Sequence, residues 1–126
     1  GAATGRPRRV GGFDVVASRY GVAMQGADEL ALTKLDILSG IGDIPVCMAY
    51  EVDGVRTDLF PSGDRLMRAK PVYDTVPGWD EDISGCRAWE ELPKNARSYV
   101  EFLEKAVGCP ITYISVGPER EQYIKR

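Results

Sequence analysis

The first residues of the chain combine arginines with a proline and small side chains. Arg6 and Arg8 flank Pro7, and Thr4 and Gly5 precede them. An arginine presents a planar fork of donors that matches two oxygens of a carboxylate or a phosphate. Two such forks in one loop could hold an acidic ligand. The alternative is a solvated basic terminus, and the segment taken alone favours that alternative.

A second polar motif, Thr33-Lys34-Leu35-Asp36, ends a short apolar run. Guanine carries two adjacent donors, its ring N–H and its exocyclic amine, and one carboxylate can accept both. Adenine has no matching donor pair on that edge, so Asp36 is chemically suited to select GTP over ATP. The aliphatic stem of Lys34 could lie over the base while its ammonium stays in water. The alternative is a lysine and an aspartate that flank a core leucine.

The third motif, Ser115-Val116-Gly117-Pro118, also follows a short apolar segment. Ligands of open α/β sheets bind at the carboxyl ends of the strands. Ser115 can donate or accept a hydrogen bond, and Gly117 allows close approach of the backbone to a ring. The alternative is an ordinary turn after a strand. If the strands before the second and third motifs are neighbours, both loops line one crevice.

Helical patterns on both sides of these motifs predict the elements that position them. A helix is expected to begin at Phe13 and to end at Gly26, and a second is expected over Pro93–Val107. Apolar residues at three-then-four spacing define one buried face in each helix. In the first helix these residues are Phe13, Val16, Ala17, Tyr20, Ala23 and Met24, and in the second Ala96, Tyr99, Val100, Leu103, Ala106 and Val107.

Strands are expected between and after these helices. The apolar run 30–35 predicts a buried strand that ends at Asp36, and 111–114 predicts another. Residues 44–52 are rich in β-branched side chains, and Asp53-Gly54 after them predicts a hairpin with 55–57, because the favoured two-residue turn needs positive φ at both positions. Residues 72–76 predict a further strand. The pattern indicates an α/β fold that has a mixed sheet, flanking helices and a β-hairpin.

Composition excludes several classes of function. The 126 residues suffice for one domain, and a net charge of -3 offers no general attraction to nucleic acid or to an acidic membrane. No apolar stretch is long enough for a membrane span. The separated cysteines 47, 86 and 109 lack the spacing of a zinc site and are expected to be reduced in a cytosolic protein.

The sequence has no histidine, the residue that most often transfers protons near neutral pH. The acidic run 80–82 is expected to be a solvated loop and not a metal site. Trp79 and Trp89 are expected to pack in the core or beneath a lid. If the protein is an enzyme, its proton-transfer groups are expected outside this chain.

In their order and spacing, the three motifs and the segments between them resemble the adenylosuccinate synthetase family. The resemblance runs essentially from end to end. It is carried by Thr4-Gly5-Arg6-Pro7-Arg8-Arg9, Phe13-Asp14, Ala31-Leu32-Thr33-Lys34-Leu35-Asp36, Val46-Cys47, Ala49-Tyr50, Gly54, Pro77-Gly78-Trp79 and Ser115-Val116-Gly117-Pro118.

The resemblance implies a part of a fold similar to P-loop NTPases, with a substrate-binding loop over 1–12 and a guanine-binding α/β region over 13–126. It also implies a GTP-dependent ligase that joins IMP to L-aspartate and makes adenylosuccinate, GDP and phosphate in purine biosynthesis. By resemblance, aspartate is bound by Ala2, Ala3, Thr4, Gly5, Arg6, Pro7 and Arg8, IMP by Arg6, and GTP by Arg8, Lys34, Leu35, Asp36, Ser115, Val116 and Gly117.

The family's phosphate-binding loop, its catalytic aspartate and histidine, and its Mg²⁺ ligands have no counterpart in this sequence. We therefore expect the C-terminal part of the enzyme, inactive by itself, with no catalytic residue and no metal ligand of its own. The resemblance further implies a cytoplasmic homodimer that needs the N-terminal part of the same protein. The alternative function is a non-enzymatic module, either a guanine-nucleotide binder or a structural interaction domain.

Overall fold

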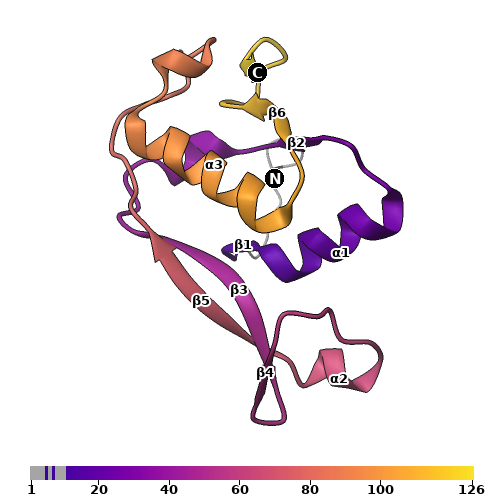
Figure 1. Cartoon of the computed structure of the whole chain (residues 1–126). Coiled ribbons are helices and arrows are strands. Elements are labelled where there is room, and N and C mark those ends of the chain that lie inside the picture. The colour runs from indigo at the N-terminus through magenta and orange to yellow at the C-terminus, as the bar shows by residue number, and fades with distance from the viewer. Residues whose placement is uncertain (1–4, 6, 8–10) are drawn as a thin grey trace.

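The larger of two sheets is built around one long strand, β3 (Ile44–Val52). The computed structural model describes Gly5, Pro7 and residues 11–126. Within it, β3 pairs in parallel with β1 (Phe13–Asp14) and antiparallel with β4 (Val55–Thr57) and β5 (Lys70–Val76). The β3–β5 ribbon extends away from the rest of the fold toward the β4 turn (Figure 1).

The smaller sheet has β6 (Ile111–Ser115) as its central strand. On one side β6 pairs in parallel with β2 (Leu30–Leu32), and on the other it pairs antiparallel with β7 (Tyr123–Lys125). Since β2 and β6 are parallel, their carboxyl ends lie at the same edge of this sheet.

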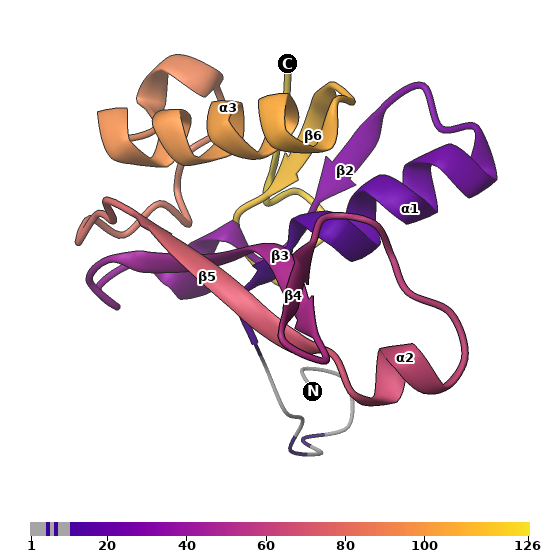
Figure 2. The ribbon, with the colours of Figure 1, turned by 60° about the horizontal axis from the view of Figure 1, so that its bottom comes forward.

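Two helices lie on the same side of the β3–β5 ribbon (Figure 2). The helix α1 (Val15–Gln25) begins at Asp14, whose carboxylate accepts the Ala17 N–H over 2.9 Å, and it ends at Gly26 in the left-handed conformation with φ 63°. The helix α3 (Lys94–Val107) ends in the same way, at Gly108 with φ 78°. Three short elements complete the chain, the 3₁₀ turns η1 (Leu35–Leu38) and η2 (Trp89–Glu91) and the one-turn helix α2 (Asp64–Met67).

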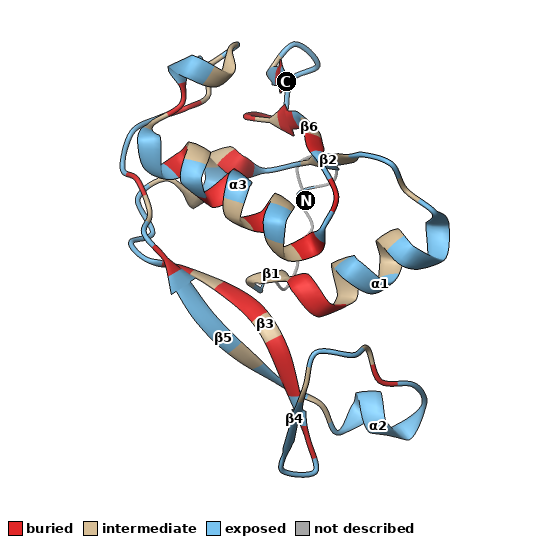
Figure 3. Ribbon diagram, in the orientation of Figure 1, coloured by how far each residue is buried: buried red, intermediate tan, exposed pale blue. Residues whose placement is uncertain are grey.

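The main hydrophobic core lies between α3 and the strands of both sheets. One face of α3 contributes Ala96, Tyr99, Val100, Leu103 and Val107, all buried. Burial is concentrated in α3, β3 and β6, whereas β4 and α2 are mostly exposed (Figure 3). Trp79 belongs to this core and donates its indole N–H to Ser39 Oγ over 2.9 Å, which confirms a packing role.

Several predicted elements are confirmed. Asp53 and Gly54 have φ values of 52° and 81°, as the hairpin prediction requires, and Val52 pairs with Val55 across the turn. The predicted second helix is α3, and the predicted strand at 111–114 is β6, one residue longer. The α/β class with a mixed sheet is confirmed, although the strands divide into two sheets.

The prediction for the first helix was partly wrong. Phe13 and Asp14 form a short strand that pairs with β3. Asp14 is the N-cap residue and has an extended conformation, so the helix begins only at Val15. Of the expected buried face, Val16 is buried, but Tyr20 is 47% exposed and Met24 68% exposed. The C-terminal half of α1 therefore projects beyond the core.

The predicted strand over 30–35 was too long. It ends at Leu32, because Lys34 adopts the left-handed conformation with φ 64° and η1 starts at Leu35. Leu35 is buried as expected, but in the turn and not in the strand. Within Gly5, Pro7 and residues 11–126, none of the helices has the length and apolar composition that crossing a membrane requires.

Candidate functional site

The motifs at 33–36 and 115–118 leave the sheet side by side. The strands that carry them, β2 and β6, are hydrogen-bonded parallel neighbours, with Leu32 opposite Ile114. The next residues, Thr33 and Ser115, therefore start adjacent at one edge of the smaller sheet. We call residues 33–36 the β2 loop and residues 115–118 the β6 loop. The sequence predicts a shared crevice for the two loops if β2 and β6 are neighbours, and this condition is met.

The β2 loop presents one carboxylate from the 3₁₀ turn η1. Left-handed Lys34 reverses the chain into η1, where Leu35 is buried against the core and Asp36 is half-buried. Lys34 itself is exposed. Among the described residues, no salt bridge or side-chain hydrogen bond engages the Asp36 carboxylate. Asp36 is thus available to accept donors of a ligand, while Leu35 can offer only its backbone.

The β6 loop is held from behind by Gln122. The Val116 N–H donates to the Gln122 carbonyl over 2.9 Å, and the Glu119 N–H donates to Gln122 Oε1 over 2.9 Å. The side-chain amide of Gln122 also donates, through Nε2, to the Ser84 carbonyl over 3.3 Å. Sequence reasoning missed Gln122, because its partners are backbone groups that no pattern in the sequence identifies.

Gly117 leaves open the space that the Gln122 side chain occupies. A Cβ at Gly117 would lie 2.3 Å from Gln122 Cδ, far inside van der Waals contact. The structure thus gives a reason for the glycine within the chain itself. Close approach of the backbone to a ligand ring stays a prediction. Val116 is fully buried, and Ser115 donates its hydroxyl to the Gly117 carbonyl over 3.1 Å, so contacts within the chain support this loop.

A cavity of about 470 Å³ begins beside the β2 loop. Its lining includes Thr33, Lys34 and Leu35 of the β2 loop together with Gly11 and Gly12. The structure thus brings the β2 loop to the end of the arginine-bearing segment. Asp36 and the β6 loop are not part of this lining.

The arginine-bearing segment itself falls largely outside the described residues. Of the predicted aspartate-binding set, Gly5 and Pro7 are described and both are exposed. The predicted binding residues that lie outside the described part are Ala2, Ala3, Thr4, Arg6 and Arg8.

A second polar cluster, which sequence reasoning did not identify, anchors the chain where that segment ends. The Tyr50 hydroxyl donates to the Asp14 carboxylate, which also caps α1. Burial, followed by this hydrogen bond and the carboxylate charge, raises the pKa of Tyr50. Burial also raises the pKa of the Cys47 thiol, with Asp14 as the second cause. The cluster keeps β1 joined to β3 and is not arranged as a nucleophile with a base.

The described residues offer no metal site. Nowhere in Gly5, Pro7 and 11–126 do three His, Cys, Asp or Glu side chains come together in a way that could hold an ion. In the acidic run 80–82, the Asp82 carboxylate accepts the Ser84 N–H over 2.9 Å, which lowers the pKa of Asp82. The three cysteines are free thiols, as predicted.

Comparison with known proteins gives one consistent result. The sequence model described as adenylosuccinate synthetase matches residues 1–124. The chain is 53% identical over 125 residues to the adenylosuccinate synthetase of Corynebacterium urealyticum and 48% identical over 126 residues to that of Bifidobacterium longum subsp. infantis. These alignments cover 98% and 99% of this chain and 29% of each relative.

A solved structure agrees with the sequence comparisons. The fully ligated adenylosuccinate synthetase of Plasmodium falciparum superposes with a TM-score of 0.90 at 36% identity, over 100% of this chain and 31% of that one. The chain thus spans less than a third of the length of the relatives that it matches. With a family model that covers nearly every residue, the chain belongs to the adenylosuccinate synthetase family.

Proposed function

We propose that this chain is the C-terminal part of a longer GTP-dependent ligase that joins IMP to L-aspartate and releases adenylosuccinate, GDP and phosphate. The observation that carries the proposal is the pairing of β2 with β6, which starts the β2 loop and the β6 loop side by side. Binding at the carboxyl ends of neighbouring parallel strands is the usual arrangement in open α/β sheets.

In this proposal the two loops read guanine between them. The carboxylate of Asp36, which no side chain of the described residues engages, accepts the ring N–H and the exocyclic amine. The stem of exposed Lys34 covers one face of the base. Leu35, Val116 and Gly117 are buried, so they contribute backbone groups and shape. Because Gln122 and η1 hold both loops in place, little ordering is needed when the nucleotide binds.

The N-terminal segment supplies cations in the proposed reaction. Arg6 and Arg8, with the Thr4 hydroxyl, hold the carboxylates of the aspartate substrate, Arg6 also reaches IMP, and Arg8 lies near GTP. Guanidinium forks orient carboxylates and stabilise developing charge without transferring protons. Gly11 and Gly12 lie at one cavity with the β2 loop, which supports a common site for this segment and the nucleotide.

The proposed chemistry proceeds in two displacements. The 6-oxygen of IMP attacks the γ-phosphorus of GTP, and the bond to the bridging oxygen breaks and leaves GDP. The aspartate amine then attacks C6, phosphate departs with its bonding electrons, and the amine loses a proton. The group that accepts a proton from IMP in the first step belongs to the part of the protein outside this chain. The groups that transfer protons in the second step belong there too.

Mg²⁺ is expected in the whole enzyme, and the described residues do not fit it. No cluster of three acidic, thiol or imidazole side chains exists among them, and the Asp82 carboxylate is already hydrogen-bonded to Ser84. We therefore assign the metal ligands to the rest of the protein and route no step through the metal here.

The proposal is tested with the full-length protein by following adenylosuccinate formation with IMP, GTP and L-aspartate. Arg8→Leu removes one fork, so we expect the KM for aspartate to rise by about tenfold or more, since hydrogen bonds to charged groups contribute about 1.5–3 kcal/mol. Glu101→Leu, an exposed charge on α3, is the matched control and leaves the KM unchanged. An unchanged KM and turnover in Arg8→Leu would refute the aspartate role.

Nucleotide binding to the chain alone separates the enzyme from a non-enzymatic nucleotide sensor. A sensor built from these 126 residues would bind GTP tightly by itself and would need Mg²⁺ to do so. The ligase proposal expects weak, magnesium-independent binding of GTP to the chain alone and no turnover. Titration calorimetry with GTP and GDP distinguishes the two outcomes.

A further inference from the structure

The turn that carries Asp36 is held at its far end by Trp79. The Trp79 indole N–H donates to the Ser39 hydroxyl over 2.9 Å, and the Gly40 N–H donates to the Trp79 carbonyl over 2.8 Å. The Ser39 N–H donates in turn to the Asp36 carbonyl over 3.3 Å, which closes η1. Trp79 thus binds the stretch that directly follows Asp36 through both its side chain and its backbone.

The residue before Trp79 lies against the same stretch. A Cβ at Gly78 would lie 2.0 Å from the Gly42 carbonyl oxygen, so a glycine is needed for the two backbones to approach this closely. From the other side, the Asn95 side-chain amide donates to the Gly78 carbonyl over 2.8 Å. Since Asn95 belongs to the first turn of α3, the backbone of Gly78 and Trp79 joins this helix to the end of η1.

The core fixes the Trp79 side chain from which these contacts extend. Only 4% of Trp79 is exposed, and the centroid of its ring lies 5.9 Å from that of Tyr99 on α3. A buried indole usually has a hydrogen-bond partner, so the bond to Ser39 by itself is compatible with a purely structural role. The place of Ser39 in the chain points further, because this residue ends the turn that carries Asp36 and is bonded to Asp36.

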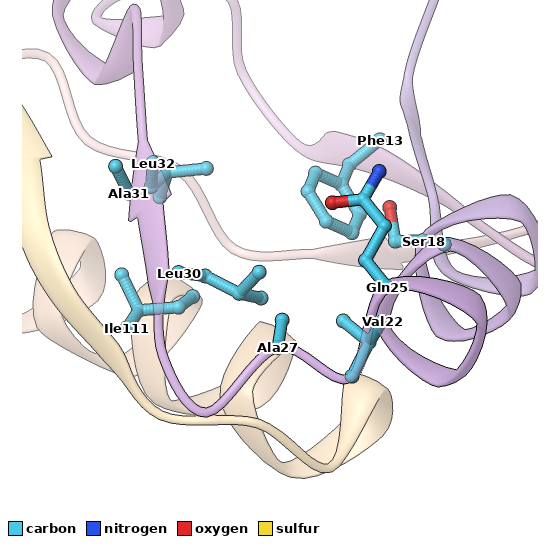
Figure 4. A pocket seen from close by; sticks show the side chains of 10 residues that line it. Phe13, Ser18, Val22, Gln25, Ala27, Leu30, Ala31, Leu32 and Ile111 are labelled. Carbon is cyan, nitrogen blue, oxygen red and sulfur yellow. The ribbon is translucent and has the colours of Figure 1, made fainter.

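On the side of α1, the described residues give β2 no comparable support. A cavity of about 260 Å³ separates α1 from β2, and its mainly apolar lining includes Val22 and Gln25 of α1 and Leu30 of β2 (Figure 4). The helix therefore does not pack closely on the strand there. Beyond the pairing of β2 with β6, hydrogen bonds from the rest of the described chain reach the turn η1 through Trp79.

We propose that Trp79 is a positioning residue for guanine recognition. It is not among the residues proposed to bind the nucleotide. It holds Ser39, and through Ser39 it fixes the place from which Asp36 presents its carboxylate. The inference rests on the proposed function, because it takes Asp36 as the group that reads guanine. It goes beyond that function by assigning a share of the selectivity to a core residue outside both loops.

Selectivity of this kind is sensitive to the position of a single carboxylate. A side chain that binds at two points must be held to within about 0.5 Å of the productive geometry. Without the bond from Trp79 to Ser39, the end of η1 is free to shift, and Asp36 accepts the two donors of guanine less well. ITP lacks the exocyclic amine, so its use suffers less than that of GTP. The preference for GTP should therefore fall, whereas the KM values for IMP and L-aspartate should not change.

Ser39→Ala and Ser39→Thr in the full-length protein form a matched pair. Ser39→Ala removes the acceptor, so we expect the ratio of kcat/KM for GTP to that for ITP to fall by about threefold or more, with a rise in the KM for GTP. Ser39→Thr keeps the hydroxyl, and the extended backbone of this residue suits threonine, so the ratio should stay within about twofold of that of the unmodified protein. A smaller amount of folded protein would lower the rates with both nucleotides alike and would leave the ratio unchanged.

Trp79→Phe reports on the same bond from the other side. It keeps an aromatic ring beside Tyr99 but lacks the N–H, so it should lower the ratio as much as Ser39→Ala does. The double variant should lower the ratio no further, because both substitutions remove one bond. Val107→Ala, in the buried face of α3 at the end far from Asn95, is the matched control. It should lower the melting temperature and leave the ratio unchanged.

If the unmodified protein prefers GTP and both Ser39→Ala and Trp79→Phe keep that preference, the proposal is overturned while the guanine assignment stands. KM values for IMP and L-aspartate that rise by the same factor as the KM for GTP would also overturn it, since they would assign Trp79 a general structural role. Equal use of GTP and ITP by the unmodified protein would refute the guanine assignment itself, and this inference with it.

Discussion

The contact between Gly117 and Gln122 predicts a strong coupling between two substitutions. In Gly117→Ala the new methyl group would lie 2.3 Å from Gln122 Cδ and Oε1, so the glutamine side chain must leave its position. This displacement breaks the two hydrogen bonds of the Gln122 side chain, one with the Glu119 N–H and one with the Ser84 carbonyl. At about 1 kcal/mol for each bond, Gly117→Ala should lower the free energy of unfolding by about 2 kcal/mol.

Removal of the glutamine side chain should abolish most of that cost. Gln122→Ala loses the same two bonds, about 2 kcal/mol, but it opens the space that the methyl group of Gly117→Ala needs. In the double variant the second substitution should therefore cost less than about 0.5 kcal/mol. The expected coupling energy is about 1.5–2 kcal/mol, well above the scatter of independent sites.

Urea unfolding of the four proteins in the cycle measures this coupling. Ser98→Ala, at an exposed position of α3, serves as a control that should not couple with either substitution. If the effects of Gly117→Ala and Gln122→Ala add within error, Gln122 does not brace the β6 loop. The glycine would then have to be explained by the ligand.

Two further predictions concern the elements beneath the site. Glu104 accepts the N–H of buried Ile111 over 2.7 Å and pairs with Arg126 over 2.8 Å, so Glu104→Ala should lower the free energy of unfolding by about 1–3 kcal/mol. Glu104→Gln keeps an acceptor and should cost less than about 1 kcal/mol in the same urea titration; equal losses would contradict the reasoning. Burial raises the pKa of Tyr99 from its ordinary 10.0 to about 12. The contribution of Tyr99 to the free energy of unfolding is therefore fully present below pH 10. It is lost between pH 10 and pH 12 at about 1.4 kcal/mol per pH unit, because only the unfolded state ionises there. Tyr99→Phe should make the alkaline decline in the free energy of unfolding shallower. An unchanged decline would show that Tyr99 does not ionise with unfolding in this range.

The elements that the sequence predicts well are those specified by local chemistry. The Asp53-Gly54 turn fixes its own hairpin, because both residues must adopt positive φ. In α3 the periodic apolar face is the face that the core buries, so periodicity alone locates it. The sequence did not predict that β2 pairs with β6, and stated only what would follow if the two strands were neighbours. They are about 80 residues apart in sequence, and no local pattern specifies such a long-range pairing.

The errors occur where tertiary context decides. Tyr20 and Met24 continue the apolar spacing of α1, yet both are largely exposed. The residues of α1 that the core buries, Val15 and Val16, are in its first turn. The left-handed conformation of Lys34 ended β2 early, and lysine gives no signal for that conformation. The role of Gln122 depends on backbone groups brought to it by folding, so the chemistry of its own side chain could not reveal it.

The guanine assignment is tested most directly by comparing GTP with ITP, which lacks the exocyclic amine, in the full-length protein and in Asp36→Asn. A carboxylate that accepts two donors should favour GTP by about tenfold or more in kcat/KM, since a hydrogen bond to a charged group contributes about 1.5–3 kcal/mol. An amide can accept only one of the two donors, so the account predicts that Asp36→Asn reduces the preference to about threefold or less. Undiminished preference for GTP in Asp36→Asn would contradict the account.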